Sequence, residues 1–441
     1  IVKHLINLII MKNYISTFAF LFCCTLGIAQ QTPAADQQNS ILILGATAHI
    51  GDGSILENSA IGLRDGKIIE VATADAVQNE YSKTIDATGQ HLYPGFIAAN
   101  STVGMVEVDA VRATNDLNEI GEYLPHIRTI IAYNAESKVV ESLRPNGILS
   151  AQIVPTRGVI SGSSSVVKLD AWNWEDAALV TDEGLHINWP QAYTSNRRRG
   201  PSSDIKYNKK SYEEKIKSLS EFLKESMAYN QVQSKTKHLP FAAMNNAFVG
   251  SQTVYLQADG QREIVDGIQF LKEHQIKNVV LVGGNEAHLV TDFLKKHDIP
   301  VIVSRPHRLP TQEDQDIKLP FKMAKILMDA GLLITVDVSG RMERMNTRNL
   351  PFYAGSFAAY GVPKEKAVQM ITLNAAKIIG VADRLGSLTV GKDATLFVSL
   401  GDALDMRTNQ LTHAFIEGRA LSLETHQTEL WKRYMEKYAR K

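Results

Sequence analysis

Cysteine is scarce in this chain. Its 441 residues include 2 cysteines, Cys23 and Cys24, which are neighbours near the start. If the segment that contains them is removed, the protein has no disulfide framework, no thiolate metal site and no cysteine nucleophile. Any catalytic chemistry must then come from other side chains.

Neither sign of charge is in excess. Lysine and arginine number 47, aspartate and glutamate number 47, and the formal net charge is +0. A balanced charge gives no electrostatic reason to expect binding to nucleic acid or to an anionic membrane surface. With 44% hydrophobic and 21% charged residues, the composition is that of a globular protein, and 441 residues suffice for a large barrel with a smaller domain.

Common nucleotide and hydrolase motifs are also missing. The sequence has no Gly-x-Gly-x-x-Gly, no Gly-x-x-x-x-Gly-Lys-[Ser/Thr] and no Gly-x-Ser-x-Gly. The small polar run Gly162-Ser163-Ser164-Ser165 does not supply the last of these. No motif therefore favours a dinucleotide-binding protein, a P-loop protein or a serine hydrolase.

The first 29 residues are predicted to lie outside the fold. After ten upstream residues, Met11-Lys12 begins a short basic start, residues 14–28 form an apolar run, and Gly27-Ile28-Ala29 is a small-x-small cleavage pattern. This order is typical of a bacterial signal peptide and predicts export to the periplasm or the extracellular space. Two alternatives are a membrane anchor spanning both apolar runs, which Lys12 interrupts, and a lipid anchor on Cys23 or Cys24.

Both ends of the remaining chain are rich in short strands. Asp65-Gly66, between two apolar stretches, is a strong hairpin signal. After a polar leader at 30–40, we expect 41–94 and 384–422 to form the two halves of a small β-sandwich. A C-terminal helix is predicted over 423–441.

Strand-like and helical segments alternate between these halves, as a parallel (β/α)8 barrel requires. We expect residues 95–383 to form this barrel, with Asn374 capping a short helix that ends at Gly380. The polar segment 195–204 is either a surface loop or an arginine-bearing lid over the barrel mouth. Strands are predicted at 147–154, 162–169, 254–258, 279–284, 300–303 and 332–337, and helices at 211–227, 262–274, 287–297 and 319–330.

Two motifs resemble those of a known family. Tyr93-Pro94-Gly95-Phe96-Ile97 and the run Gly386 to Leu396, which includes Gly391-Lys392-Asp393-Ala394, are similar to sequences of the amidohydrolase superfamily, imidazolonepropionase-like branch. The resemblance extends from Ile41 to Ser422, with Thr395 where the family usually has aspartate. It implies a TIM barrel inserted in a β-sandwich. It also implies hydrolysis of carbon–nitrogen bonds other than peptide bonds, for example in a cyclic amide or an imidazolone, with one or two metal ions at the carboxyl ends of the strands.

Most metal-ligand positions of that family are substituted here. The first barrel strand of the family continues as Asp-x-His-x-His, whereas this chain has Asn100 and Thr102 at the two histidine positions. Gln257 stands where a later strand has histidine, and Asp337 matches the aspartate that binds metal and moves protons. The resemblance implies zinc as the family's metal. Neutral amides and hydroxyls are poor zinc ligands, so Asp337 and His288 are the metal-ligand candidates left in this chain.

We expect the substituted positions to bind substrate. Asp337 is predicted to act as the catalytic residue, and Asn100, Thr102, Gln257 and His307 to contact substrate at the barrel mouth. For Asp337 the alternatives are a cap on the next helix or pairing with Arg341 or Arg344. For His288 the alternative is a surface histidine, and for the amides a purely structural hydrogen bond.

Two functions of different class follow from these residues. The first is a hydrolase with a reduced site, in which Asp337 is the base. The second is a metal-free pseudoenzyme that binds a small molecule or serves as the partner of an active amidohydrolase. We expect a small-molecule ligand, no nucleic acid, no membrane span after signal cleavage, and a homo-oligomer or a hetero-oligomer with another amidohydrolase. The loss of the histidines favours the metal-free pseudoenzyme over the hydrolase, since an uncharged amide cannot replace imidazole in a site that lowers the pKa of water.

Overall fold

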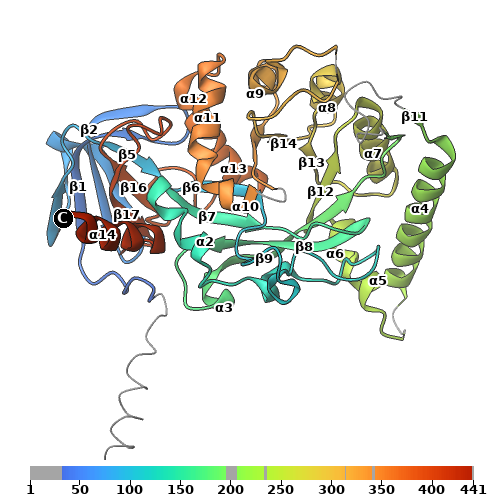
Figure 1. Ribbon diagram of the computed structural model, residues 1–441, viewed down its shortest axis with the longest axis horizontal. Helices are drawn as coiled ribbons and strands as arrows, with labels where there is room; N and C mark the ends of the chain where they lie inside the picture. Colours follow the sequence, from blue (N-terminus) through green and yellow to red (C-terminus); the bar gives the residue numbers. More distant parts are fainter. Residues whose placement is uncertain (1–31, 195–205, 233–235, 313, 340–342, 440–441) are drawn as a thin grey trace, which may run out of the picture. The chain divides into compact units, whose positions relative to one another are not determined.

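Strands from residues 41–94 and from residues 396–420 join in one β-sheet in the computed structural model (Figure 1). The structure describes residues 32–194, 206–232, 236–312, 314–339 and 343–439. The chain divides into a unit of residues 1–33 and a unit of residues 34–441, and the elements below belong to the second. The predicted signal peptide at 1–29 and the segment 195–204 lie outside the described residues.

The terminal sheet has eight strands in the order β18-β17-β16-β5-β1-β2-β3, with β4 paired to β1. Antiparallel pairing of β16 with β5, Phe397 opposite Tyr93, joins the C-terminal strands to the N-terminal ones. The predicted association of the two ends is confirmed. These strands are β1 (Ile41–His49), β2 (Ile55–Arg64), β3 (Lys67–Thr73), β4 (Lys83–Asp86), β5 (His91–Pro94), β16 (Leu396–Ser399), β17 (Leu411–Ile416) and β18 (Arg419–Ala420).

The predicted Asp-Gly hairpin is confirmed between β2 and β3. Asp65 has φ 51° and Gly66 has φ 75°, so both turn residues adopt the left-handed conformation of a type I′ turn. Aspartate tolerates this region better than most residues, and glycine has no side chain to oppose it.

Eight strands close a barrel in the order β12-β13-β14-β15-β6-β7-β8-β9. Sheet strand β5 ends at Pro94 and barrel strand β6 begins at Phe96, so Gly95 alone separates the two sheets. A side chain at Gly95 would lie 3.0 Å from Leu149 and Thr395, which explains why glycine fits this crossing. The barrel strands are β6 (Phe96–Ser101), β7 (Ile148–Ile153), β8 (Ile160–Lys168), β9 (Ala178–Asn188), β12 (Thr253–Ala258), β13 (Val279–Gly283), β14 (Val301–Ser304) and β15 (Ile334–Asp337).

The predicted strand–helix alternation is wrong for one part of the barrel. Strand β8 runs antiparallel to both β7 and β9, and the strand β9 was not predicted. The link from β7 to β8 covers only residues 154–159. A parallel return needs a crossover of about a dozen residues or more, so the chain must turn back directly. The other neighbouring pairs in the barrel are parallel.

Helices cover the outside of the barrel, and their apolar faces pack on the strands. Buried Leu219 and Leu223 of α4, with Ile264 and Ile268 of α7, belong to the main hydrophobic core. Among the described residues, no helix combines the length and the apolarity that a membrane crossing needs. The helices are α2 (Lys138–Glu141), α3 (Trp174–Ala177), α4 (Lys209–Gln231), α5 (Leu239–Ala243), α6 (Asn245–Val249), α7 (Gln261–Glu273), α8 (Thr291–Lys296), α9 (Leu319–Asp329), α10 (Glu343–Asn346), α11 (Leu350–Ala359), α12 (Lys364–Met370), α13 (Leu373–Ile378) and α14 (His426–Ala439).

Helix α13 packs against residues of the barrel interior. Ala375 and Ile378 cluster with barrel residues such as Val282 and Ile302. The prediction that Asn374 caps this helix is wrong, because the N-cap is Thr372. Asn374 instead donates from Nδ2 to the carbonyl of Ile334 at 3.2 Å, which attaches α13 to the start of β15.

Candidate functional site

Strands β6 and β15 bring Asn100 and Asp337 into contact at the carboxyl end of the barrel. The two strands pair at Ala99 and Asp337, so Asn100 is the next residue along β6. Asn100 has φ 50°, a conformation that asparagine adopts more readily than most residues. Its Nδ2 donates to Oδ1 of Asp337 at 2.9 Å, and 4% of the residue is exposed.

Asp337 is the carboxyl group with the clearest electrostatic signature at this rim. Burial raises its pKa to about 6, hydrogen bonds from Ser339 and Asn100 act in the opposite direction, and the charge of Asp259 raises the pKa further. The backbone N–H of Ser339 donates to Oδ1 at 2.8 Å, a bond within the local turn. The alternative partner Arg341 and the side chain of Arg344 lie outside the described residues.

Asp259 and Arg308 are two charged groups at this rim that the sequence did not mark as site residues. Asp259 follows directly after β12, and burial raises its pKa while Arg308 opposes that shift. Burial lowers the pKa of Arg308, and the charge of Asp259 acts against this. The position of Asp259 at the end of a barrel strand could have identified it, by the same argument that selected Asp337.

Gln257 and Asp259 crowd a glycine on the neighbouring strand. A Cβ at Gly283 would lie 2.5 Å from Nε2 of Gln257 and 2.6 Å from Oδ1 of Asp259, and the φ of Gly283 is 87°. The backbone of β13 therefore makes room for both side chains. The structure places Gln257 beside Asp259, which itself influences Asp337.

The remaining predicted residues have different surroundings. Thr102 is 1% exposed, and among the described residues its Oγ1 has no hydrogen-bond partner. His288 lies in a short 3-10 turn at Ala287–Leu289, as expected for a residue near a helix start, and burial lowers its pKa. His307 contacts Ser356 of α11 and the ring of Tyr353, and it lines a cavity of about 420 Å³ together with Met406.

A buried polar chain leads from Asn100 into the barrel, and sequence analysis missed it. The backbone N–H of Asn100 donates to Oε1 of Gln152 at 2.9 Å, and Nε2 of Gln152 donates to Oε1 of Glu183 at 2.7 Å. Ser164 donates to the same Glu183 oxygen at 2.5 Å, and Tyr255 donates to Oε2 at 2.9 Å. Gln152 is the long polar side chain in the buried strand Ile148–Ile153 and was a usable signal, whereas Glu183 lay on the strand that was not predicted.

Burial controls the ionisation of this chain. It raises the pKa of Glu183, although the three side-chain hydrogen bonds work against that rise. Burial also raises the pKa of Tyr255 well above its ordinary value. His186 stacks on Tyr255 with ring centroids 4.7 Å apart, and burial lowers its pKa to about 3, so this imidazole is neutral near pH 7.

The residues at the rim do not fit a zinc centre. Within the part of the chain that the structure describes, no three histidine, cysteine, aspartate or glutamate side chains are grouped so that they could hold a metal ion. The side chain of Asn100 donates a hydrogen bond to Asp337. In a metal site, by contrast, both side chains would direct an oxygen lone pair at the cation. Thr102 offers a neutral hydroxyl and Gln257 a neutral amide, and both groups bind zinc poorly.

The protonation of Asp337 should be visible in the pH dependence of stability. The folded state raises its pKa from 3.8 to about 6. The folded protein thus holds this proton more tightly than the unfolded chain, and the resulting stabilisation is present below about pH 3.8 and lost as pH rises through about 6. Asp337→Asn keeps an Oδ1 acceptor for Asn100 and Ser339 and removes the charge, so its thermal midpoint should rise relative to wild type between pH 4 and pH 8. Asp329→Asn, at an exposed carboxylate, is the control. A constant difference between the thermal midpoints of Asp337→Asn and wild type across that pH range would contradict the raised pKa of Asp337.

The fold and the rim together define a TIM-barrel protein whose candidate site lies at the carboxyl ends of the strands. Residues 255–421 match the sequence model of the amidohydrolase family. The match spans from β12 to just beyond β18, so strand β6 with Asn100, and Thr102 directly after it, precede the matched residues. No curated protein sequence matches the chain.

Solved structures share the fold at low identity. An amidohydrolase from Thermotoga maritima MSB8 has a TM-score of 0.74 and 21% identity over 87% of this chain and 99% of that chain. A prolidase in complex with N-methylphosphonate-L-proline has a TM-score of 0.53 and 13% identity, covering 87% of this chain and 99% of its own. An adenosine deaminase from Xanthomonas campestris with bound zinc has a TM-score of 0.53 and 14% identity, covering 93% and 99%.

Proposed function

We propose that this protein is a metal-free member of the amidohydrolase superfamily, of the imidazolonepropionase-like branch, that binds a small polar molecule at the carboxyl rim of its barrel. One contact carries the proposal: Nδ2 of Asn100 donates to Oδ1 of Asp337 at 2.9 Å. The amide thus satisfies the carboxylate oxygen that a cation would otherwise take. The donors and acceptors left at the rim suit hydrogen bonding to a ligand better than Lewis-acid chemistry.

The ligand class follows from the groups at the rim and from the resemblance to the family. Asp337 accepts hydrogen bonds, the buried hydroxyl of Thr102 has a free donor among the described residues, and Gln257 offers both kinds of group. A cyclic amide or imidazolone presents N–H donors next to a carbonyl acceptor, which is the complementary pattern. Such a ligand would lie against Asp337 through an N–H and against Gln257 through its carbonyl.

A second candidate function is metal-independent hydrolysis with Asp337 as general base. The observation in its favour is that burial raises the pKa of Asp337 to about 6. A base with a pKa near the working pH combines a useful fraction of the ionised form with good proton affinity. In this case Asp337 takes a proton from water as the water attacks the carbonyl carbon of the ligand. The carbon–nitrogen bond then breaks, and the leaving nitrogen takes the proton from Asp337.

Calorimetry with hydantoin and a 4-imidazolone separates these functions. The binding function predicts saturable binding without turnover in protein treated with a chelator, and a dissociation constant raised about tenfold or more in Asp337→Ala, the loss expected for a charge-assisted hydrogen bond. Asp329→Ala, an exposed carboxylate on α9, is the matched control and should bind as wild type does.

The turnover assay decides between the alternatives. Hydrolysis that survives chelation and disappears in Asp337→Asn would favour the general-base function. Hydrolysis that is lost on chelation and restored by zinc would contradict both proposals. Assembly with an active amidohydrolase is a further proposal from the sequence, and co-purification of a histidine-tagged chain with such a partner would test it.

A further inference from the structure

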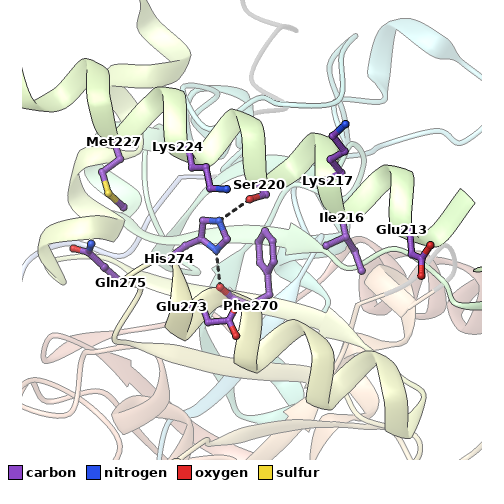
Figure 2. Close-up of a pocket in the computed structure, with 10 residues that line it drawn as sticks. All are labelled: Glu213, Ile216, Lys217, Ser220, Lys224, Met227, Phe270, Glu273, His274 and Gln275. Carbon is purple, nitrogen blue, oxygen red and sulfur yellow. Dashed lines mark hydrogen bonds between the residues drawn. The ribbon is translucent and has the colours of Figure 1, made fainter. Parts of the chain in front are cut away.

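A second polar cluster lies in a groove between α4 and α7, on the outer side of the barrel (Figure 2). The groove has a volume of about 660 Å³, which is within the range of small-molecule sites. Apolar Phe270, Ile216 and Met227 line it, together with Ser220 and His274. None of these residues belongs to the rim around Asp337, so this inference is independent of the proposed function.

The hydrogen bonds of His274 define which ring nitrogen carries the proton. Nδ1 lies 2.8 Å from the carbonyl oxygen of Phe270, and a carbonyl only accepts, so Nδ1 must donate. In the neutral ring, Nε2 then has a free lone pair. Nε2 lies 2.9 Å from Oγ of Ser220, so the serine hydroxyl donates to it. Figure 2 shows both bonds converging on the one imidazole.

Another serine–histidine pair in this chain has the opposite polarity. Oγ of Ser356 donates to the carbonyl of Phe352 at 2.8 Å, and it also lies 2.8 Å from Nε2 of His307. Because the serine proton is already donated, His307 must donate to Ser356. His307 therefore cannot withdraw a proton from that serine, whereas His274 is arranged to withdraw one from Ser220.

We propose that Ser220 is a nucleophile that His274 activates, and that the groove between α4 and α7 hydrolyses small carboxylic esters. Oγ of Ser220 forms a bond to the acyl carbon while its proton passes to Nε2 of His274. The bond from the acyl carbon to the leaving oxygen breaks, and that oxygen takes the proton from His274 and departs as the alcohol. Water then attacks the acyl group on Ser220 and gives a proton to Nε2 of His274. The bond from the acyl carbon to Oγ breaks, Oγ takes the proton back from His274, and the acid leaves.

The surroundings of Ser220 suit this substrate class. Lys224 lies four residues after Ser220, so it is one turn away on the same face of α4, and it lines the groove. Its ammonium group can stabilise the negative charge that develops on the carbonyl oxygen, whereas the ammonium group of Lys217 pairs with Glu221 at 3.9 Å. The ring of Phe270, next to His274 at 4.2 Å between centroids, offers an apolar surface to the alkyl part of the ester.

Labelling with a fluorophosphonate probe tests the assignment. Wild-type protein should form one adduct, which peptide mass spectrometry maps to Ser220, and it should hydrolyse p-nitrophenyl acetate. Ser220→Ala should abolish the adduct, and His274→Gln should slow labelling about 100-fold, the usual scale of general-base assistance. Ser356→Ala is the matched control and should react as wild type does.

Two results would overturn the proposal. One is no adduct at Ser220 under conditions in which trypsin, run in parallel, is labelled completely. The other is a labelling rate that His274→Gln leaves unchanged. If Ser220→Ala does not fold, Ser220→Cys provides the test: iodoacetamide should alkylate this cysteine faster than the cysteine of Ser356→Cys, and an equal or slower rate would also reject the proposal.

Discussion

A triple variant with Asn100→His, Thr102→His and Gln257→His is expected to bind zinc at least about a thousandfold more tightly than wild type. The reason is that three imidazoles and the carboxylate of Asp337 form a set of four zinc ligands, whereas the natural residues at these positions are weak neutral groups. Histidine also tolerates the left-handed backbone found at position 100, where φ is 50°. Competition with a chromophoric chelator, followed by elemental analysis, measures the affinity and the stoichiometry.

Adding Asp337→Ala to the triple variant is the matched control and should weaken zinc binding again. A triple variant that folds and takes up no more zinc than wild type would show that the three positions do not converge. The correspondence between Gln257 and the histidine of the family would then be wrong. Proper folding of the variant can be verified from its near-UV circular dichroism.

Asp170→Ala is expected to lower the free energy of unfolding by about 3–5 kcal/mol, the cost of leaving buried charges without their partner. Oδ1 of Asp170 lies 3.1 Å from Nη1 of Arg144, and Oδ2 lies 3.0 Å from Nη1 of Arg419. The side chains of Arg144, Asp170 and Arg419 are 4%, 2% and 9% exposed, so water cannot replace the carboxylate. Equilibrium urea unfolding measures the effect.

The same cluster ties the barrel to the terminal sheet, since Asp170 follows β8 and Arg419 begins β18. Asp329→Ala, in which an exposed carboxylate loses its pairing with Lys325, should cost less than about 1 kcal/mol. Asp170→Asn should cost less than Asp170→Ala, because it keeps one oxygen acceptor. Equal stabilities of Asp170→Ala and Asp329→Ala would show that the cluster does not couple the two sheets.

Sequence patterns predicted the architecture wherever the signal was local. The Asp65-Gly66 turn has its own backbone preference, and the apolar stretches at Val279–Gly283 and Val301–Ser304 are recognisable as buried strands without knowledge of their neighbours. The same patterns failed at β9, because its residues Thr181, Asp182 and Glu183 interrupt the apolar run. The antiparallel direction of β8 was overlooked, although the predicted strands 147–154 and 162–169 leave too short a link for a parallel crossover.

The candidate site was predictable in part. The end of a barrel strand selected Asp337, and the resemblance to a family selected Asn100, Thr102 and Gln257. Gln152 was overlooked although it lies in a predicted strand, and Glu183 was missed because its strand β9 was not predicted. His307 was selected by its position after a strand, and the structure shows contacts with Ser356 and Tyr353 instead.

The sequence by itself determined which chemical groups are available: two adjacent cysteines, no histidine at positions 100, 102 and 257, and an aspartate at the end of the last barrel strand. Only the tertiary structure decided which of these groups meet. Asn100 and Asp337 are 237 residues apart and share a hydrogen bond because β6 and β15 close the barrel side by side. Ser220 and His274 are 54 residues apart and meet because α4 and α7 pack against each other. The composition of a chain limits its chemistry residue by residue, whereas a hydrogen bond depends on strand register and helix packing, which are properties of the folded chain as a whole.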